Sequence, residues 1–506
     1  MNRIFLIFVS LILSATSLTA QGQQPSGNKY LLTLEEVVEI AKMQSPQAIL
    51  ARHQFRASYF RFLDYKATFL PKLTLTTQPT TYNKSIETTP SFDNDGNYVT
   101  REVKRNTFTS TAGLALSQNI GFTGGSISLG SDFRRTQNFL EKNSDATTSY
   151  TTSPVSLSIS QPLNGYNQFR WTKQIEPLRY EEARQNYIVA IENVSSRAIN
   201  NFFLLAIAQV NLNIAQTNLK NTEELYNITQ GRYNLGTVAE DDLLRVELRH
   251  MQATSSLSDT KVRIESARSV LRAFLGFKDN VEIELLVDPE IPSFQVPYEE
   301  ALNLALTRNP DIISYNRQIL EAERDAALAK SQKGITLNLE ASFGTNKTGY
   351  TFNDAYSPRF DDREGVSLRI TVPILDWNQS RNRYRQAQSS LEVTEARMQQ
   401  QETDFRQDVF LQVMSFNMQE DQLRIAAKSD TIANKTYSIA YQRYLAGKGT
   451  VTDLNLADTA KDEAKKDYMN ALNKYWSLYY SVRQLTLFDF QNKKPLEEDF
   501  EKIIGD

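Results

Sequence analysis

The stretch "VPYEEALNLALTRNPDI", Val296–Ile312, decides the fold because the chain contains its pattern twice. The earlier copy is "LTLEEVVEIAKMQSPQA", Leu32–Ala48, which stands 264 positions before it. In both copies two adjacent glutamates lie near the start of an amphipathic pattern, where acidic side chains favour the positive end of a helix. Each stretch therefore predicts a helix, and the repetition predicts that two parts of the chain fold alike.

The repetition covers most of the chain. At the offset of 264 the match runs without a gap from Leu32 to Leu75. At a second offset, 211, "YNITQGRYNLGTVAEDDL" (Tyr226–Leu243) aligns with "YSIAYQRYLAGKGTVTDL" (Tyr437–Leu454). The two offsets differ by 53 positions, which indicates an insertion of that length in the first copy. These two matches indicate a tandem duplication. The period of more than 200 residues is far longer than that of a solenoid repeat, which excludes that architecture.

Each copy is predicted to contain a helix, strands, a long helix and a further helix. At ~1.5 Å per residue the long helices extend ~90–100 Å, which exceeds an ordinary globular helix and implies coiled-coil packing. The predicted elements are a helix at 33–69, strands within 72–161, a long helix at 176–234 and a helix at 240–275 in the first repeat (21–275), then a helix at 298–333, strands within 335–373, a long helix at 379–445 and a helix at 453–487 in the second repeat (276–490), and a C-terminal tail at 491–506.

The segment between the first helix and the long helix of each copy alternates in polarity. "SPVSLSISQP" (153–162) and "EGVSLRITVP" (364–373) place apolar side chains on one face and mainly polar ones on the other, as β-strands do. Two interpretations fit: a soluble sheet whose polar face meets water, or a transmembrane barrel whose apolar face meets lipid and whose polar face lines a lumen. In the second case Arg369 is a candidate lumen residue.

The insertion in the first copy predicts a β-hairpin at 109–133 that turns at Gly121–Gly125. We expect polar loops at 81–105, 138–152 and 344–364. Four to six strands cannot close a membrane barrel, since the smallest barrels need about eight, and an open edge in lipid leaves backbone groups unsatisfied. If the strands cross a membrane, several chains must share one barrel, and three chains would supply twelve or eighteen strands.

Composition excludes several classes of function. A net charge of −3 provides no basic excess for nucleic acid. The chain has no cysteine and two histidines, so we expect no disulfide framework, no metal site and no cofactor. The N-terminus, "MNRIFLIFVSLILSATSLTAQ", predicts a signal peptide at 1–20. No later stretch holds 18 consecutive apolar residues, so we expect an exported protein without a transmembrane helix.

The order of these motifs resembles that of the TolC family of outer-membrane efflux and secretion channels. The motifs are Ser-Pro and Asn-Pro in the first helices, "SQPLNG" and "TVPILD" before the long helices, and "GRYNLGTV" and "QRYLAGKGTV" at the helix tips. The resemblance covers the mature chain to about residue 490. It implies a mixed α and β fold, in which a transmembrane β-barrel shared between protomers joins a long antiparallel coiled-coil α-helical barrel.

The resemblance also implies a function, a location and partners. The expected protein is a homotrimer in the outer membrane with its helical part in the periplasm, a passive duct of a tripartite efflux or type I secretion system. A periplasmic adaptor (membrane fusion) protein and an inner-membrane pump of the RND, ABC or MFS type would dock on it. The alternative that the residues leave open is a soluble periplasmic coiled-coil scaffold with a small β-domain. Dependence on detergent separates the two.

The candidate site residues follow from the resemblance. In the family, aspartates and a tyrosine near the tip of the second-copy hairpin line or lock a closed entrance. By motif position these are Asp453 and Tyr444, and their first-copy counterparts are Asp242 and Asp241. These four residues form the candidate pore constriction. The candidate tip turns for adaptor docking are those at Gly236 and Gly447.

The chain departs from the family pattern at two tip positions. Leu456 stands where a second ring aspartate is expected, and Gly449 where an arginine is expected. The two-ring cation site and the lock of the family are therefore incomplete here. Asp453 and Asp242 also fit as helix N-caps, and the tip glycines as left-handed turn residues. The "LAGKGT" segment lacks the order of a phosphate loop and joins two helices, so we expect no enzyme.

Overall fold

The structure is a computed structural model and describes residues 29–92, 95–140, 147–278, 281–288 and 294–505. The predicted signal peptide at 1–20 lies outside the described residues. The chain divides into two compact units. Described residues of the first unit fall within Met1–Pro46, Val194–Pro292 and Gln422–Ser477, and those of the second unit fall within Gln47–Asn193, Ser293–Asp421 and Leu478–Asp506.

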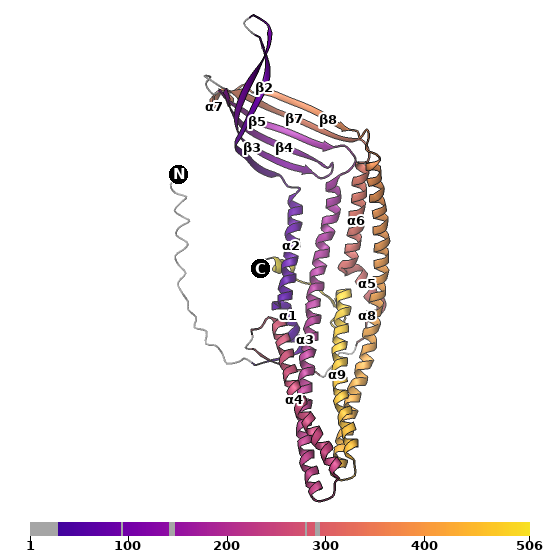
Figure 1. Cartoon of the computed structure of the whole chain (residues 1–506). Coiled ribbons are helices and arrows are strands. Elements are labelled where there is room, and N and C mark those ends of the chain that lie inside the picture. The colour runs from indigo at the N-terminus through magenta and orange to yellow at the C-terminus, as the bar shows by residue number, and fades with distance from the viewer. Residues whose placement is uncertain (1–28, 93–94, 141–146, 279–280, 289–293, 506) are drawn as a thin grey trace. The chain divides into compact units, whose positions relative to one another are not determined.

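The second unit contains a six-stranded antiparallel sheet with the strand order β2-β3-β4-β5-β7-β8 (Figure 1). The first copy contributes four strands and the second copy two, because the hairpin in the insertion joins the sheet. The strands at the two edges of the sheet are β2 and β8. The bounds are β2 (Lys72–Phe92), β3 (Tyr98–Ile120), β4 (Gly125–Leu140), β5 (Thr147–Pro162), β7 (Thr336–Gly349) and β8 (Asp361–Thr371), with the short helix α7 (Phe352–Ala355) between β7 and β8.

Much of the three predicted loops, 81–105, 138–152 and 344–364, is in fact strand. β2 and β3 pair from Thr81↔Thr109 to Phe92↔Tyr98, and β4, β5, β7 and β8 extend into the other two ranges. These segments are rich in threonine and serine rather than alternating in polarity. Backbone ladders form whatever the polarity of the side chains, and threonine favours strands, so the alternation rule misses strands with two polar faces.

Proline divides the first helix of each copy, so the single helices predicted at 33–69 and 298–333 are wrong. The residues before the prolines, Ser45 and Asn309, are extended, with ψ values of 146° and 133°. A residue before proline avoids the helical region, and proline has no N–H to continue the helix. The four resulting helices are α1 (Leu34–Gln44), α2 (Pro46–Ala67), α5 (Tyr298–Arg308) and α6 (Pro310–Ser331).

Two helical hairpins complete the copies. The first long helix begins at Gln168 rather than near residue 176. A proline is common in the first turn of a helix, which is where a helix at 176–234 would put Pro177, but the observed helix contains Pro177 in its interior. The members of the hairpins are α3 (Gln168–Asn234) and α4 (Glu240–Leu275), then α8 (Gln379–Leu445) and α9 (Val451–Thr486). Among the described helices, α3 alone is long and apolar enough by composition to cross a membrane.

Short elements fasten the ends of the helices. In the first unit β1 (Lys29–Leu32) pairs in parallel with β6 (Glu282–Leu285). Thr33 then starts α1 with a reciprocal capping box to Glu36. In the second unit the C-terminal segment forms β9 (Phe488–Asp489), β10 (Lys494–Pro495) and α10 (Phe500–Gly505). The predicted C-terminal tail is thus folded over most of its length.

A buried ionic network fixes the C-terminal segment in the second unit. Arg483 on α9 donates two hydrogen bonds to the carboxylate of Glu192 on α3, at 2.9 and 3.0 Å, and one to Asp489 at 3.2 Å. The Tyr479 hydroxyl donates to the second oxygen of Asp489 at 2.6 Å. Burial favours the neutral acid, but hydrogen bonds from Tyr479 and Asn492 outweigh it and hold the pKa of Asp489 below its usual value. One buried guanidinium thus balances two buried carboxylates.

Replacing that guanidinium should destabilise the second unit. We expect Arg483→Met to lower the free energy of unfolding by about 3–5 kcal/mol, because two carboxylates would remain buried without a counter-charge. Thermal unfolding in detergent, followed by circular dichroism, measures the change. Arg406→Met is the matched control, since Arg406 pairs with Glu402 on the exposed side of α8. Equal melting temperatures for the two variants would contradict the role of the network.

Candidate functional site

One face of the sheet carries apolar side chains in cross-strand rows. A single row pairs Leu73 with Leu116, Leu129, Leu157 and Phe343. Most members of this face are exposed; Leu73 is 64% and Val366 78% exposed. The other exposed members are Leu75, Leu114, Leu116, Leu129, Ile159, Phe343, Leu368 and Ile370. A contiguous exposed apolar surface of this size marks contact with another protein or with lipid.

The opposite face of the sheet carries small and hydroxyl side chains. The row next to the leucines pairs Thr74 with Ala115, Gly130, Ser156 and Gly344. Arg369, the candidate lumen residue, lies on this face with its guanidinium 3.9 Å from Glu340 of β7. The sheet is therefore apolar on one side and polar on the other, the pattern of a strand set that separates lipid from an aqueous lumen.

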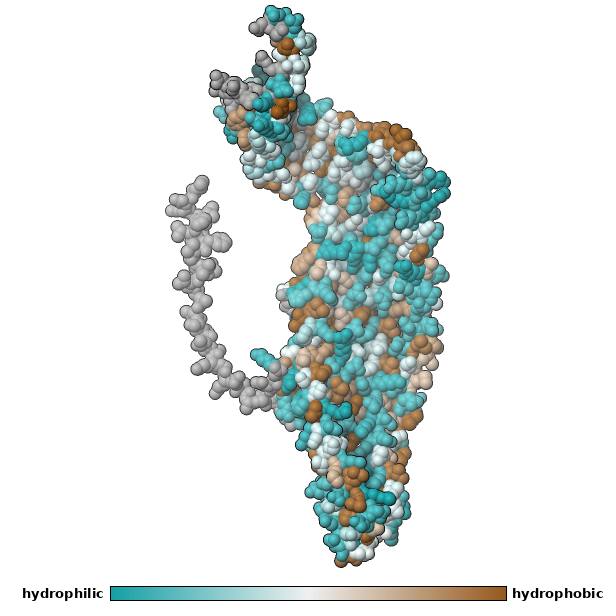
Figure 2. Space-filling view, viewed as in Figure 1, coloured by the Kyte–Doolittle hydropathy of each residue, from teal (hydrophilic) through white to brown (hydrophobic). Residues whose placement is uncertain are grey.

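Aromatic side chains gather near both ends of the strands. Beside the end of β4 that lies away from the helices, Phe108 packs against Tyr82 and Phe139, with ring centroids 4.9 and 5.5 Å apart. At the end where α8 begins, Phe122 and Trp377 are 86% and 83% exposed, and Figure 2 shows hydrophobic residues gathered where β8 meets α8. Aromatic girdles at the two membrane interfaces flank the apolar band of transmembrane strands.

The tip turns of the two helical hairpins lie in the first unit and have the same backbone conformation. Gly236 and Gly447 have φ values of 72° and 70°, in the left-handed region that favours glycine. After the second turn, Thr450 caps α9: its hydroxyl accepts from the Asp453 N–H at 3.1 Å and donates to the Asp453 carboxylate at 2.7 Å. Asp453 is therefore the third helical residue of a capping box rather than the N-cap itself.

The four predicted constriction residues lie in different environments. Hydrogen bonds from Thr450 hold the pKa of the exposed Asp453 below its usual value. Asp241 is exposed and 3.5 Å from Arg245, and Asp242 lies in the first turn of α4 without acting as its N-cap. Tyr444 is buried in the core of the tip. That core consists of Leu225, Val246, Tyr444 and Leu454.

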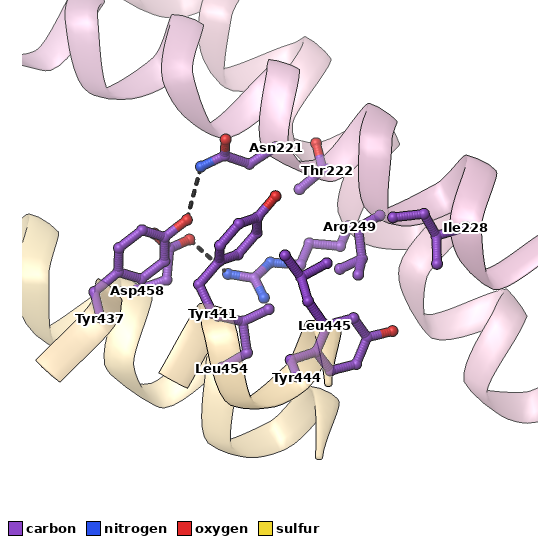
Figure 3. Close-up of a pocket in the computed structure, with 11 residues that line it drawn as sticks. Asn221, Thr222, Ile228, Arg249, Tyr437, Tyr441, Tyr444, Leu445, Leu454 and Asp458 are labelled. Carbon is purple, nitrogen blue, oxygen red and sulfur yellow. Dashed lines mark hydrogen bonds and ion pairs between the residues drawn. The ribbon is translucent and has the colours of Figure 1, made fainter. Parts of the chain in front are cut away.

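Polar contacts about two to four helical turns from the tip join the two hairpins (Figure 3). Arg249 of α4 donates to Asp458 of α9 at 3.0 Å, and Asn221 of α3 donates to the Tyr437 hydroxyl of α8 at 2.8 Å. We call these two contacts the tip links. Asp458 is buried and also accepts from Lys461 at 2.7 Å. Burial, with Asp458 nearby, raises the pKa of Tyr437 to about 12, so its phenol stays neutral.

The tip links were not predicted from the sequence. Asn221, Arg249 and Asp458 lie outside the repeated tip stretches, and Tyr437 is the first residue of one but carried no assigned role. One signal was present. Leu454, Asp458 and Lys461 follow one another at spacings of four and three, so a carboxylate lies on the face that Leu454 buries. A charge on the apolar stripe of a helix indicates a paired partner on a neighbouring helix. Among the described residues no group of three or more histidine, aspartate or glutamate side chains is arranged to hold a metal ion.

Comparison with protein families gives a match to the model described as "Outer membrane efflux protein", over residues 124–277 and 301–486. One matched segment lies in each copy, which confirms the tandem duplication. Among curated proteins the chain is similar to the alkaline protease secretion protein AprF of Pseudomonas aeruginosa, with 23% identity over 47% of this chain and 49% of AprF. Nodulation protein T of Rhizobium leguminosarum bv. trifolii is 23% identical over 55% of this chain and 59% of that protein. The matches thus span about half the length of these relatives.

Solved structures share the fold over nearly the whole chain. The CmeC outer membrane channel of Campylobacter jejuni superposes with a TM-score of 0.64 at 16% identity, covering 93% of this chain and 88% of CmeC. The outer membrane protein VceC of Vibrio cholerae gives 0.61 at 13% identity, covering 92% and 97%. At such low sequence identity these superpositions show a shared fold and no more. They confirm the predicted mixed α and β class.

Weakening one tip link should loosen the tip. We expect Asp458→Asn to raise backbone hydrogen exchange in α9 and in the part of α4 around Arg249 by about 10- to 100-fold. The reason is that a hydrogen bond between charged groups contributes about 1.5–3 kcal/mol to local stability. Hydrogen–deuterium exchange with mass spectrometry measures the effect. Asp241→Asn, which alters an exposed pair on α4, serves as the control and should leave exchange unchanged. Equal exchange in both variants would show that the link does not hold the hairpins together.

Proposed function

The chain belongs to the outer membrane efflux protein family, as its resemblance to the TolC family predicts, and we propose that it forms a trimeric outer-membrane channel. The channel is the passive exit duct of a tripartite efflux or type I secretion system. Its strands cross the outer membrane and its helices extend into the periplasm. The duct performs no chemical step. An inner-membrane pump drives the substrate through it.

The two-faced sheet is the observation that carries this proposal. Its leucine rows are exposed and would be costly in water, but they match the hydrocarbon core of a bilayer. The opposite face offers hydroxyl groups and small side chains to a water-filled lumen. A soluble scaffold with a small β-domain would have no use for an exposed apolar face bordered by aromatic residues. More than one copy is needed, because the edges of one open sheet cannot remain unpaired in lipid, and the trimer that the resemblance to the TolC family implies meets this need.

A periplasmic adaptor of the membrane-fusion type docks at the hairpin tips. The turns at Gly236 and Gly447 are exposed, and Leu235 beside the first turn is 79% exposed. An apolar side chain exposed at the turn between two helices suits a helix-in-groove contact with a partner hairpin. The adaptor couples the channel to an inner-membrane pump of the RND, ABC or MFS type.

The tip also forms the constriction of the closed channel. Threefold symmetry places three Asp453 carboxylates around one axis, with Asp242 and Asp241 as further members of the constriction. Tyr444, which the sequence pattern also placed in the constriction, is buried in the tip core and supports the turn from inside. Like charges held close together attract cations. The capping box is compatible with this role, because it engages one oxygen of Asp453 and leaves the side chain exposed.

Bilayer recording tests the proposed function. The purified mature protein should require detergent, run as a heat-labile trimer on a gel, and form steady conducting pores in a planar lipid bilayer. The same protein unfolded by heat before reconstitution is the control and should not conduct. A monodisperse monomer in plain buffer would contradict the channel and favour the soluble scaffold.

Substitution at the constriction tests the role of Asp453. We expect Asp453→Ala and Asp453→Asn each to weaken block of the pore by a divalent cation by about tenfold or more, because both remove the carboxylate charge. Titration of the conductance with the cation measures the block. Asn can still accept the capping hydrogen bond, so an effect of Ala alone would reduce Asp453 to a helix cap. Glu402→Gln, on α8 in the second unit, is the charge control.

A further inference from the structure

Two strands of the described sheet have a free edge. β3, β4, β5 and β7 each pair on both sides, whereas β2 and β8 pair on one side only. All of β8 and nearly all of β2 are exposed. A neighbouring copy that extends the sheet through backbone hydrogen bonds can therefore join only at β2 or at β8. Because β2 runs away from the helices and β8 runs toward them, β8 of one copy and β2 of the next would pair antiparallel.

The register across the sheet determines how a ring of copies would close. One row of paired residues runs from Lys72 of β2 to Gly365 of β8, through Ser117, Ser128, Ser158 and Ser342. Thr371, the last residue of β8, lies six residues beyond Gly365. If the strand ends next to the helices are level around the ring, Thr371 lies beside Lys72 of the next copy. Each copy then advances the register by six residues.

Three such copies satisfy the geometry of a closed barrel. They supply eighteen strands and a total stagger of eighteen residues. With strands ~4.8 Å apart and ~3.3 Å per residue, equal numbers of strands and stagger give a tilt of about 35°, the value typical of barrels. No adjustment of strand length or register is needed to reach this tilt.

We propose that three chains close one eighteen-stranded barrel, in which Gly365–Thr371 of each chain pairs with Lys72–Gln78 of the next. The inference rests on the trimeric channel proposed above and specifies how its membrane part is assembled. The seam keeps both faces continuous: Leu368 comes beside Leu75 on the apolar face, and Arg369 beside Thr74 on the polar face. The seam ends at Pro79, which has no N–H to donate and stands at a shift in the β2–β3 register.

The competing arrangement has twelve strands, with β4 of one copy paired to β8 of the next and the β2–β3 hairpin outside the barrel. It would require β4 to release β3 along the whole ladder from Arg105↔Leu140 to Ile120↔Gly125. It would also leave the leucines of β2 and β3 without lipid to contact. The two arrangements differ in width. By strand number and tilt, the backbone diameter is about 35 Å for eighteen strands and about 24 Å for twelve.

Engineered cysteines distinguish the two seams, because the chain has no cysteine of its own. The first variant is Thr74→Cys with Arg369→Cys, which are directly opposite in the proposed seam. The second variant is Ser128→Cys with Arg369→Cys, which would be opposite in the twelve-stranded arrangement. All of these positions lie on the polar face, so a short bismaleimide can reach them in trimers purified in detergent. Denaturing gels then show whether covalent dimers and trimers form.

We expect the first variant to give covalent dimers and trimers at least tenfold more abundant than those of the second. Each single-cysteine variant gives the background. Linking in the second variant alone, or in neither variant while the trimer stays intact, would overturn the eighteen-stranded barrel and leave the channel function standing. A protein that is monomeric and does not conduct would overturn both. If the paired variants fail to assemble, the wild-type trimer imaged at strand resolution decides the number of strands.

Discussion

Backbone hydrogen bonding at the two edges of the sheet is the constraint on which the rest of the structure depends. Each free N–H and C=O on β2 and β8 costs several kcal/mol if it faces hydrocarbon, so the sheet cannot be stable in a bilayer as one chain. The leucine rows make lipid the suitable surroundings for the outer face. Assembly from several copies is therefore a consequence of the strands themselves, and the long helices, being attached to the same end of the sheet, must assemble with them.

The two units are held by different kinds of contact. In the second unit Arg483, Glu192 and Asp489 form a buried network with multiple hydrogen bonds, which is expensive to break and fixes one geometry. In the first unit the tip has a small apolar core around Tyr444 and a few polar links between hairpins. A segment with few buried apolar contacts opens at low free-energy cost. The tip is thus suited to movement, whereas the network holds the C-terminal end of α9 against α3.

The sequence predicted those parts of the fold that rest on local pattern. Alternating leucine and serine marked β4, β5 and β8, and the tip glycines marked the turns, because a left-handed backbone nearly requires glycine. Strands such as β2, with polar residues on both faces beyond Thr81, carry no such alternation and were expected to be loops. The helix breaks were visible as prolines, but a helix can also continue through a proline, as α3 does at Pro177. The tip links depend on which helices become neighbours, and a single sequence does not contain that information.

Successive strands run alternately away from the helices and back toward them, and this alternation limits how the fold can change in evolution. The chain leaves the sheet after β5 to form α3, so the number of strands between α2 and α3 must be even for α3 to start on the correct side of the membrane. A single added strand would deliver the long helix to the cell exterior. A hairpin, in contrast, adds two strands and preserves the direction of everything that follows. Growth of the first copy by one hairpin is thus the smallest change that widens the sheet without inverting the rest of the chain.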